Sequence, residues 1–245
     1  MRYITLFCFL FALTTHAQSI SQIGADIDGT KGDHFGSSVS LSSDGSILAI
    51  GAANSDKNGN NSGHVSVYNY TNGSWSQIGA DIDGEAAGDY SGYSVSLSSD
   101  GTILAIGANE NDGNGNASGH VRVYEYSNSS WIQVGNDIDG EAAGDYSGSS
   151  VSLSSDGTIL AIGAVGNDAN GNASGHVRVY EYSNSSWTQV GNDIDGEFTS
   201  DYFGESVSLS SDGSIIAIGA PRHNKFNSPS YADAGHVKIY NYING

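Results

Sequence analysis

The sequence predicts an all-β protein, a β-propeller of four blades with four antiparallel strands in each. Two observations carry this prediction. First, the chain repeats itself: Ile132–Trp187 matches Ser76–Trp131 at 49 of 56 positions, and the tetrapeptide Asp-Ile-Asp-Gly begins at Asp26, Asp81, Asp137 and Asp193. Second, each repeat holds four short strand-like runs separated by turn residues. This combination is typical of a propeller blade, whereas the alternative, a β-helix, usually has shorter coils.

Residues 1–17 have the pattern of a secretory signal peptide. Arg2 provides a positive charge, Ile4–Leu13 is an apolar run too short to span a bilayer, and Ala17 ends the segment. The only cysteine, Cys8, lies inside this segment, so residues 18–245, the expected propeller, contain no disulfide. We therefore expect a secreted or cell-surface protein, and no later stretch is predicted to span a membrane.

The first two strands of each repeat are predicted as a hairpin. In the second copy, Ser94–Ser98 alternates serine with Val95 and Leu97, which is the period of a strand with one apolar face. Ile103–Ala108 is continuously apolar, as expected for a strand that is covered on both faces. The intervening Ser-Asp-Gly-Thr sequence, residues 99–102, favours a tight turn.

The third and fourth strands follow a polar loop. Residues 119–126 alternate around Val121 and Val123, and residues 131–138, which begin with Trp131, form the predicted fourth strand. No segment shows a helical period or helix start signals.

Several residues resemble the FG-GAP repeat, the blade of the integrin α-subunit propeller and of many bacterial surface proteins. The resemblance rests on Phe203-Gly204, Ser206–Ser208 and Ile218–Pro221, with Phe35-Gly36 as a second instance. The middle copies depart from it, with Tyr-Ser-Gly in place of Phe-Gly. The resemblance implies that the Ser-Val-Ser-Leu strand is innermost, and that the protein is a non-enzymatic adhesion module. It also implies a calcium loop between the first two strands, where this chain has one aspartate per hairpin.

The order of the strands predicts how the ring closes. Residues 19–27 match only the fourth strand of a repeat, and the last repeat, 202–242, ends after its third strand. Pairing of these two segments would complete a fourth blade and remove two exposed edges. We therefore expect a closed, monomeric ring of sixteen strands. Because propellers of the FG-GAP type usually have seven blades, a dimer that completes one larger ring is the alternative.

The chain is strongly acidic, with a net charge of −19. Such a charge disfavours binding to nucleic acid or to anionic membranes, which need basic patches. An acidic surface suits solubility or the binding of cations.

Aspartates recur after the fourth strand of each repeat and form the first candidate site. Closely spaced carboxylates beside a glycine can bind Ca²⁺, which takes six to eight oxygen ligands. The candidate ligands are Asp81, Asp83, Asp89, Asp137, Asp139, Asp145, Asp193, Asp195 and Asp201, with Glu85, Glu141 and Glu197 as additions. The alternative is that these residues cap backbone groups in turns.

Other candidates are aromatic or basic. The loop from Pro221 to Ala234 is longer than its counterparts and gathers Arg222, His223, Lys225, Phe226 and Tyr231 as candidate ligand-binding residues. Trp75, Trp131 and Trp187 could stack on sugar rings or pack within blades. The histidines of the repeated Gly-His-Val sequence, at 64, 120, 176 and 236, are assigned a structural or exposed role.

The resemblance to the FG-GAP repeat implies a non-enzymatic propeller that binds an extracellular protein or glycan, for adhesion or matrix attachment, whereas the periodicity predicts only the fold. A structural fragment of a larger surface protein is the second hypothesis. A calcium-dependent lectin-like module and a glycoside hydrolase are the remaining alternatives. No nucleophile elbow, phosphate loop or zinc-ligand spacing supports an enzyme.

Overall fold

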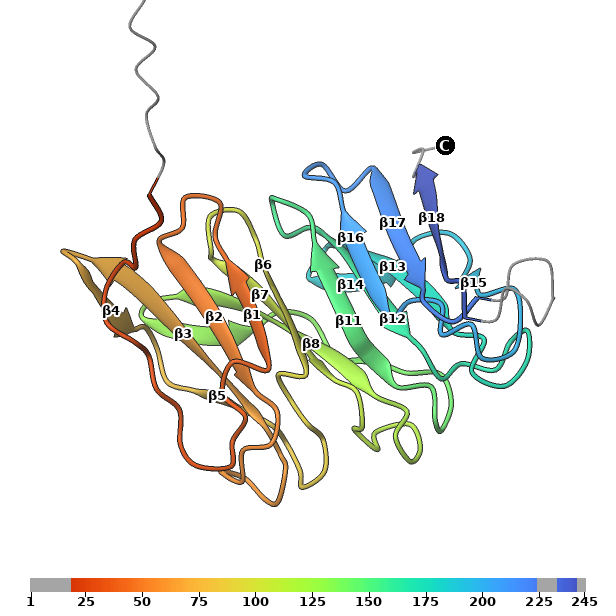
Figure 1. The fold of residues 1–245 in the computed structure, drawn as a ribbon, viewed down its shortest axis with the longest axis horizontal. Coiled ribbons are helices and arrows are strands. Elements are labelled where there is room, and N and C mark those ends of the chain that lie inside the picture. Colours follow the sequence, from red (N-terminus) through yellow and green to blue (C-terminus); the bar gives the residue numbers. More distant parts are fainter. Residues whose placement is uncertain (1–18, 224–232, 242–245) are drawn as a thin grey trace, which may run out of the picture.

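The computed structural model describes residues 19–223 and 233–241 (Figure 1). These residues form eighteen strands in four antiparallel sheets and contain no helix, which confirms the all-β prediction. None of the described segments is therefore a helix that could cross a membrane. The predicted signal peptide, residues 1–17, lies outside the described residues.

The four sheets follow one another along the chain and are numbered 1 to 4 in that order. Sheets 1 to 3 have five strands each, and sheet 4 has three described strands. Sheet 1 contains β1 (Ser38–Leu41), β2 (Ile47–Ala52), β3 (His64–Thr71), β4 (Ser74–Gln77) and β5 (Ile82–Asp83). Sheet 2 contains β6 (Ser94–Leu97), β7 (Ile103–Ala108), β8 (His120–Ser127), β9 (Ser130–Gln133) and β10 (Ile138–Asp139). Sheet 3 contains β11 (Ser147–Leu153), β12 (Ile159–Ala164), β13 (His176–Ser183), β14 (Ser186–Gln189) and β15 (Ile194–Asp195). Sheet 4 contains β16 (Ser206–Leu209), β17 (Ile215–Ala220) and β18 (His236–Asn241).

The first three strands of each sheet agree with the sequence prediction. In sheet 2, β6 pairs with β7 and β7 with β8, so the continuously apolar strand lies in the middle. The predicted Asp-Gly turn joins β6 to β7. Asp100 stabilises this turn because its Oδ1 accepts hydrogen bonds from the backbone N–H of Thr102 at 3.0 Å and from the Ser98 hydroxyl at 2.7 Å.

The prediction of one continuous fourth strand is wrong, because the structure has two short strands in its place. In sheet 2, both β9 and β10 pair with β8, at different positions along it. Gly135 lies between them with a φ of 77°, a conformation that interrupts a strand and that glycine adopts without strain. Gly79 and Gly191 interrupt sheets 1 and 3 in the same way.

The apolar core lies between the sheets. One cluster joins Val65 and Val67 of sheet 1 to Leu97 and Leu104 of sheet 2, and a second cluster joins sheets 2 and 3 in the same manner. Each junction between sheets thus buries one face of the sheet before it and one face of the sheet after it.

Serines of the innermost strands bond these junctions together. The backbone N–H of Leu97 donates to Ser40 Oγ at 2.9 Å, and the Ser94 hydroxyl donates to the Gly148 carbonyl at 2.7 Å. Backbone bonds also link the hairpin turns, from Ser43 N to Ser99 O and from Ser99 N to Ser155 O. The serine of the alternating pattern therefore bonds between sheets, which gives every junction the same geometry.

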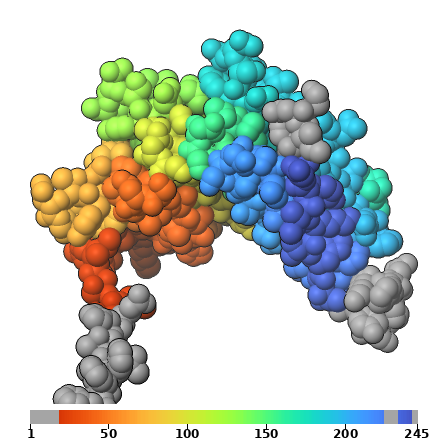
Figure 2. Space-filling model, turned by 90° about the horizontal axis from the view of Figure 1, so that it is seen from above, coloured from red at the N-terminus to blue at the C-terminus, as the bar shows by residue number. Residues whose placement is uncertain are grey.

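The prediction of a closed ring is wrong for the described residues. Residues 19–27 form no strand and lie against sheet 1, where Trp75 Nε1 donates to the Ile23 carbonyl at 3.2 Å. Figure 2 shows the N-terminal segment and β18 at opposite ends of an arc. Because each junction repeats the same contacts, successive sheets turn by similar steps, and four sheets at this step span only part of a circle. The arrangement is that of an open, propeller-like arc.

Candidate functional site

The most distinctive polar groups lie at the junctions between sheets, around the histidine that begins the third strand of each sheet. His64, His120 and His176 are each at most 4% exposed. Each of these histidines begins a strand whose next residues pack in the core, and the imidazole is buried with them. The sequence predicts a structural or exposed role for these histidines, and their burial shows that they are not exposed.

His120, His176 and His236, which begin the third strands of sheets 2 to 4, each belong to a group with one or two carboxylates. In each group, one ligand atom from every member lies within 4.8 Å of the others. The groups are Glu85–His120–Asp137, Glu141–His176–Asp193 and Glu197–His223–His236. The glutamate comes from the turn that follows the preceding sheet, so each group forms only when two sheets pack together.

An arginine side chain lies beside each of the first two groups. Arg122 donates to the Asp83 carbonyl at 2.9 Å and lies 3.5 Å from Glu85, and Arg178 makes the same pair of contacts with Asp139 and Glu141. Burial lowers the pKa of His120, and the Arg122 charge lowers it further. In both groups an arginine and a glutamate from consecutive sheets contact each other beside the buried histidine. The lowered pKa of His120 favours its neutral form.

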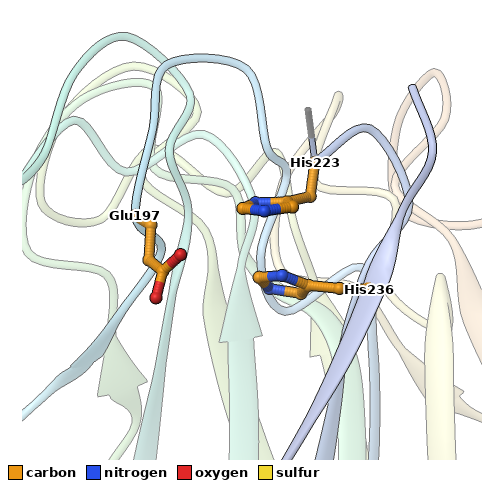
Figure 3. Close-up of side chains that lie close together, drawn as sticks. All are labelled: Glu197, His223 and His236. Carbon is orange, nitrogen blue, oxygen red and sulfur yellow. The ribbon is translucent and has the colours of Figure 1, made fainter. Parts of the chain in front are cut away.

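The third group differs because it has two imidazoles. His223, which follows β17, stacks on His236, at the start of β18, with ring centroids 3.8 Å apart and planes inclined by 32°. Figure 3 shows both rings directed towards the carboxylate of Glu197. Behind His223, the fully buried Asp201 places Oδ2 3.0 Å from Nδ1 of the imidazole.

Lys238 stands where sheets 2 and 3 have arginine. Its ammonium donates a hydrogen bond to Glu197 Oε1, which lowers the pKa of that carboxyl. Burial lowers the pKa of His236, and the neighbouring His223 and Lys238 lower it further. His236 is thus kept neutral, the form in which an imidazole can bind a metal.

The aspartates predicted as calcium ligands are distributed over three environments. Among the described residues, each of the three histidine-containing groups contains at most one of these aspartates. The first of each turn, at 81, 137 and 193, accepts a hydrogen bond from a glutamine side chain. The second, at 83, 139 and 195, lies in the short strands β5, β10 and β15. The third, at 89, 145 and 201, is buried and accepts a hydrogen bond from a backbone N–H. Calcium binding at these turns remains a prediction.

The predicted ligand-binding loop is described only in part. Arg222 lies 4.5 Å from the centroid of the Tyr202 ring, and His223 belongs to the group described above. Lys225, Phe226 and Tyr231 lie outside the described residues.

Trp131 and Trp187 each pack against the preceding sheet, and Trp75 packs against the N-terminal segment, residues 19–27. Trp131 Nε1 donates to the Ile78 carbonyl at 3.2 Å, and its ring lies 5.0 Å from that of Tyr126; Trp75 and Trp187 repeat this arrangement. Trp187 also lines a cleft of about 270 Å³ together with Asn136, Asp137 and Tyr180.

The sequence indicates His223 as a candidate ligand-binding residue but does not connect it with His236, for which it predicts a structural or exposed role. A signal was present in the repeats themselves. The position of His223 is occupied by Ser55, Asn111 and Asn167 in the other units, so only the last unit has a histidine at this position.

Comparison with known proteins agrees with the fold. The model of the FG-GAP repeat matches residues 22–68, 81–124 and 138–180, together more than half of the chain. No curated protein matches the chain.

Among solved structures, the chain is similar to a "putative 6-phosphogluconolactonase" from Bacteroides uniformis, with 12% identity and a TM-score of 0.53 over 84% of this chain and 50% of that one. It is also similar to a periplasmic gluconolactonase from Pseudomonas aeruginosa, with 17% identity and a TM-score of 0.50 over 86% of this chain and 54% of that one. At these identities the likeness shows the fold alone. The chain spans about half the length of these solved structures.

Proposed function

Because the chain belongs to the FG-GAP repeat family, we propose that it is a non-enzymatic, extracellular binding module that acts by associating with other propeller blades. The partner is a second copy of this chain, which together with the first completes a larger ring. The observation that carries the proposal is the pair of apolar sheet faces at the two ends of the arc.

The first end face belongs to sheet 1. Val39 and Leu41 of β1 are 63% and 55% exposed, whereas Leu97 and Leu153, which occupy the position of Leu41 in the next two sheets, are each 8% exposed. Leu97 and Leu153 pack against the preceding sheet, whereas no sheet precedes sheet 1 among the described residues.

The second end face belongs to sheet 4. Val237 and Ile239 of β18 are 67% and 72% exposed. Their counterparts in sheet 2, Val121 and Val123, are 0% and 1% exposed because sheet 3 covers them. Exposed apolar surface of this kind is typical of an interaction site.

The two end faces are complementary, because every internal junction joins one face of each kind. A second copy placed against sheet 4 could repeat the three hydrogen bonds of the internal junctions. These would run from Ser206 Oγ to Gly36 O, from Leu41 N to Ser208 Oγ, and from Ser211 N to Ser43 O, with the sheet 4 member from one copy and the sheet 1 member from the other. Two arcs would also supply about as many residues as the solved propellers that the chain covers by half.

The test is the mass of residues 18–245 in solution, measured by sedimentation velocity from about 1 to 100 µM. We expect a species of two chains that I239D abolishes, because a buried carboxylate at a junction is strongly unfavourable. I132D is the matched control, since Ile132 is 51% exposed but lies on the outer strand β9. A wild-type chain that stays monomeric, or an I239D variant that associates as the wild type does, would contradict the proposal.

Glycan binding is a second candidate, favoured by the cleft beside Trp187. Its lining combines aromatic rings of Trp187 and Tyr180 with the polar groups of Asn136 and Asp137, a combination suited to a sugar ring. Binding to a glycan array that is lost on W187A, while the melting temperature shows a folded chain, would support this candidate; equal binding by both proteins would exclude this cleft.

A further inference from the structure

We propose that Glu197, His223 and His236 form a binding site for one divalent transition-metal ion of the zinc type. This site is separate from the end faces, because it lies at the junction of sheets 3 and 4. It shares Glu197 and Asp201 with the last of the acidic turns considered for calcium, but its two imidazole ligands, His223 and His236, do not belong to that turn.

The donor set indicates the class of metal. Two imidazole nitrogens and one carboxylate are ligands for Zn²⁺ and its neighbours Co²⁺, Ni²⁺ and Cu²⁺, whereas Ca²⁺ and Mg²⁺ prefer oxygen. The three ligand atoms lie within 4.8 Å of one another, and Figure 3 shows the two rings and the carboxylate facing a common space. In a tetrahedral zinc site with bonds of about 2.0–2.1 Å, ligand atoms lie about 3.3 Å apart. The distances between the ligand atoms would therefore have to shorten by at most about 1.5 Å, which side-chain rotations can provide.

Asp201 supplies the support that histidine ligands of metals usually have. A ligating imidazole generally donates its other N–H to a carboxylate, which fixes the ring and its tautomer. Asp201 Oδ2 lies 3.0 Å from Nδ1 of His223, so Nε2 is the nitrogen left for the ion. Asp201 is held in turn by a 3.0 Å hydrogen bond from the backbone N–H of Phe198, and it is fully buried.

A second observation also points to a ligand. Nε2 of His236 and Oδ1 of Asp201 are buried and have no hydrogen-bond partner among the described residues. A buried polar atom without a partner is unfavourable, and a metal bound to His236 Nε2 would remove that cost. His120 and His176 also have an unpartnered nitrogen, but their groups lack the second imidazole.

The other units show what is specific to this junction. At the position of His223, sheet 3 has Asn167, whose Nδ2 lies 3.4 Å from Asp145, the counterpart of Asp201. His223 therefore keeps the contact with the aspartate and adds a nitrogen ligand. His223→Asn consequently removes the ligand while retaining a residue that the same fold accepts elsewhere in the chain.

Lys238 would compete with the ion for Glu197, because its ammonium donates a hydrogen bond to that carboxylate in the metal-free protein. The side chains of Lys238 and Glu197 are 28% and 46% exposed, so both can move apart into solvent. Sheet 1 has Ser66 at this position, which makes Lys238→Ser a substitution that the fold also accepts. Removing the lysine should tighten zinc binding about 3- to 10-fold.

The experiment is a zinc titration of untagged residues 18–245 by calorimetry with a competing chelator, together with the visible spectrum of the Co²⁺ form. We expect one ion per chain and the intense absorption of a four-coordinate cobalt site. H223N and E197Q should weaken binding at least 100-fold and 10-fold. H176N, which changes the sheet 3 counterpart of His236, should leave it unchanged.

Three outcomes would overturn the proposal: no zinc bound at 100 µM, equal affinity in H223N and wild type, or weaker binding in K238S. Circular dichroism of H223N shows whether the variant is folded, so that loss of binding is not loss of structure. The I239D variant should bind zinc as the wild type does. Failure of the association between copies would therefore leave this test intact.

Discussion

Replacing Gly107 by alanine tests the close approach between sheets on which the whole arc depends. A methyl group on Gly107 would lie 2.2 Å from the carbonyl oxygen of Gly148 and 2.3 Å from Ser94 Oγ. Non-bonded carbon atoms and their neighbours are normally 3.5–4.0 Å apart. Sheets 2 and 3 would therefore have to separate by about 1 Å, and the 2.7 Å bond between Ser94 and Gly148 would be lost.

The expected cost combines these two effects. Overpacking of a well-packed site costs about 1–3 kcal/mol, and a lost hydrogen bond about 0.5–1.5 kcal/mol. We expect G107A to lower the free energy of unfolding by about 2–4 kcal/mol. For a chain of this length that corresponds to a decrease of roughly 4–16 °C in melting temperature.

Gly219 is the matched control, because it occupies the same position in sheet 4, where no further sheet follows among the described residues. Within the part of the chain that the structure describes, the only atom within 3.5 Å of its added methyl would be Ser206 Oγ, a hydroxyl that can rotate away. Thermal melting followed by circular dichroism, at a concentration where the chain is monomeric, should show G219A within about 1 °C of wild type. Equal destabilisation by G107A and G219A would refute the reasoning. In the proposed dimer, Gly219 faces Gly36 of the second copy, so G219A should weaken association without weakening the monomer.

Two further predictions concern burial and pH. L97A should lower the free energy of unfolding by about 2–5 kcal/mol, as buried leucines do, whereas L41A should cost under about 1 kcal/mol because its side chain is half exposed; urea unfolding of both variants measures the difference, and similar midpoints would contradict the burial argument. Hydrogen bonds from the Ser210 hydroxyl and the Ser214 backbone N–H lower the pKa of Asp212 to about 2, and the same kind of turn lowers the pKa of Asp44. Because these folded-state values lie below the unfolded value of about 3.9, this stabilisation is complete above about pH 5 and is lost as the pH falls towards 2. D212N should therefore show a smaller loss of stability than wild type across that interval, and an unchanged acid profile would show that the turn does not contribute.

Local patterns in the sequence predicted the sheets well because the physical reasons are local. The alternation of serine with Val95 and Leu97 specifies a strand with one apolar face, and the Asp100-Gly101 pair specifies its turn. The same pattern occurs in each unit, and each unit forms the same hairpin. The split of the outer strand was missed because one glycine inside an apolar run is compatible with a continuous strand, and only its positive φ in the structure distinguishes the two.

Closure of the ring was not predictable in the same way. The residues that would pair in a closed ring, 19–27 and β18, have compatible strand patterns, but pairing also depends on the rotation between consecutive sheets. That rotation arises from how Leu97 and its counterparts pack against the preceding sheet, together with the bonds of Ser40 and Ser94. Small changes in a repeated step accumulate over four sheets, so the pattern of a single repeat does not determine where the last sheet lies.

The candidate metal site was also beyond local patterns, since its ligands come from three separate segments. Glu197 follows β15, His223 follows β17, and His236 begins β18, so spacing along the chain gives no recognisable motif. Comparison of the repeats could have found it, because position 223 is the one place where the usual serine or asparagine is replaced by a second histidine.

That replacement indicates where a repeat protein of this kind acquires an individual property. A residue that recurs in every unit, such as the histidine that begins the third strand, is sufficiently explained by the junction that every unit must form. The junction does not explain a residue that departs from its counterparts, such as His223. In sheet 3, the asparagine at the same position already donates a hydrogen bond to the buried aspartate. His223 satisfies its aspartate equally well and also presents a nitrogen to Glu197 and His236, so the extra group serves no need of the junction itself. The end faces differ from this site, because apolar residues recur at their positions in every repeat. The residues of the end faces are exposed because no neighbouring sheet covers them among the described residues. Association with another arc should therefore depend on the residues that the repeats share, and metal binding on the residue in which they differ.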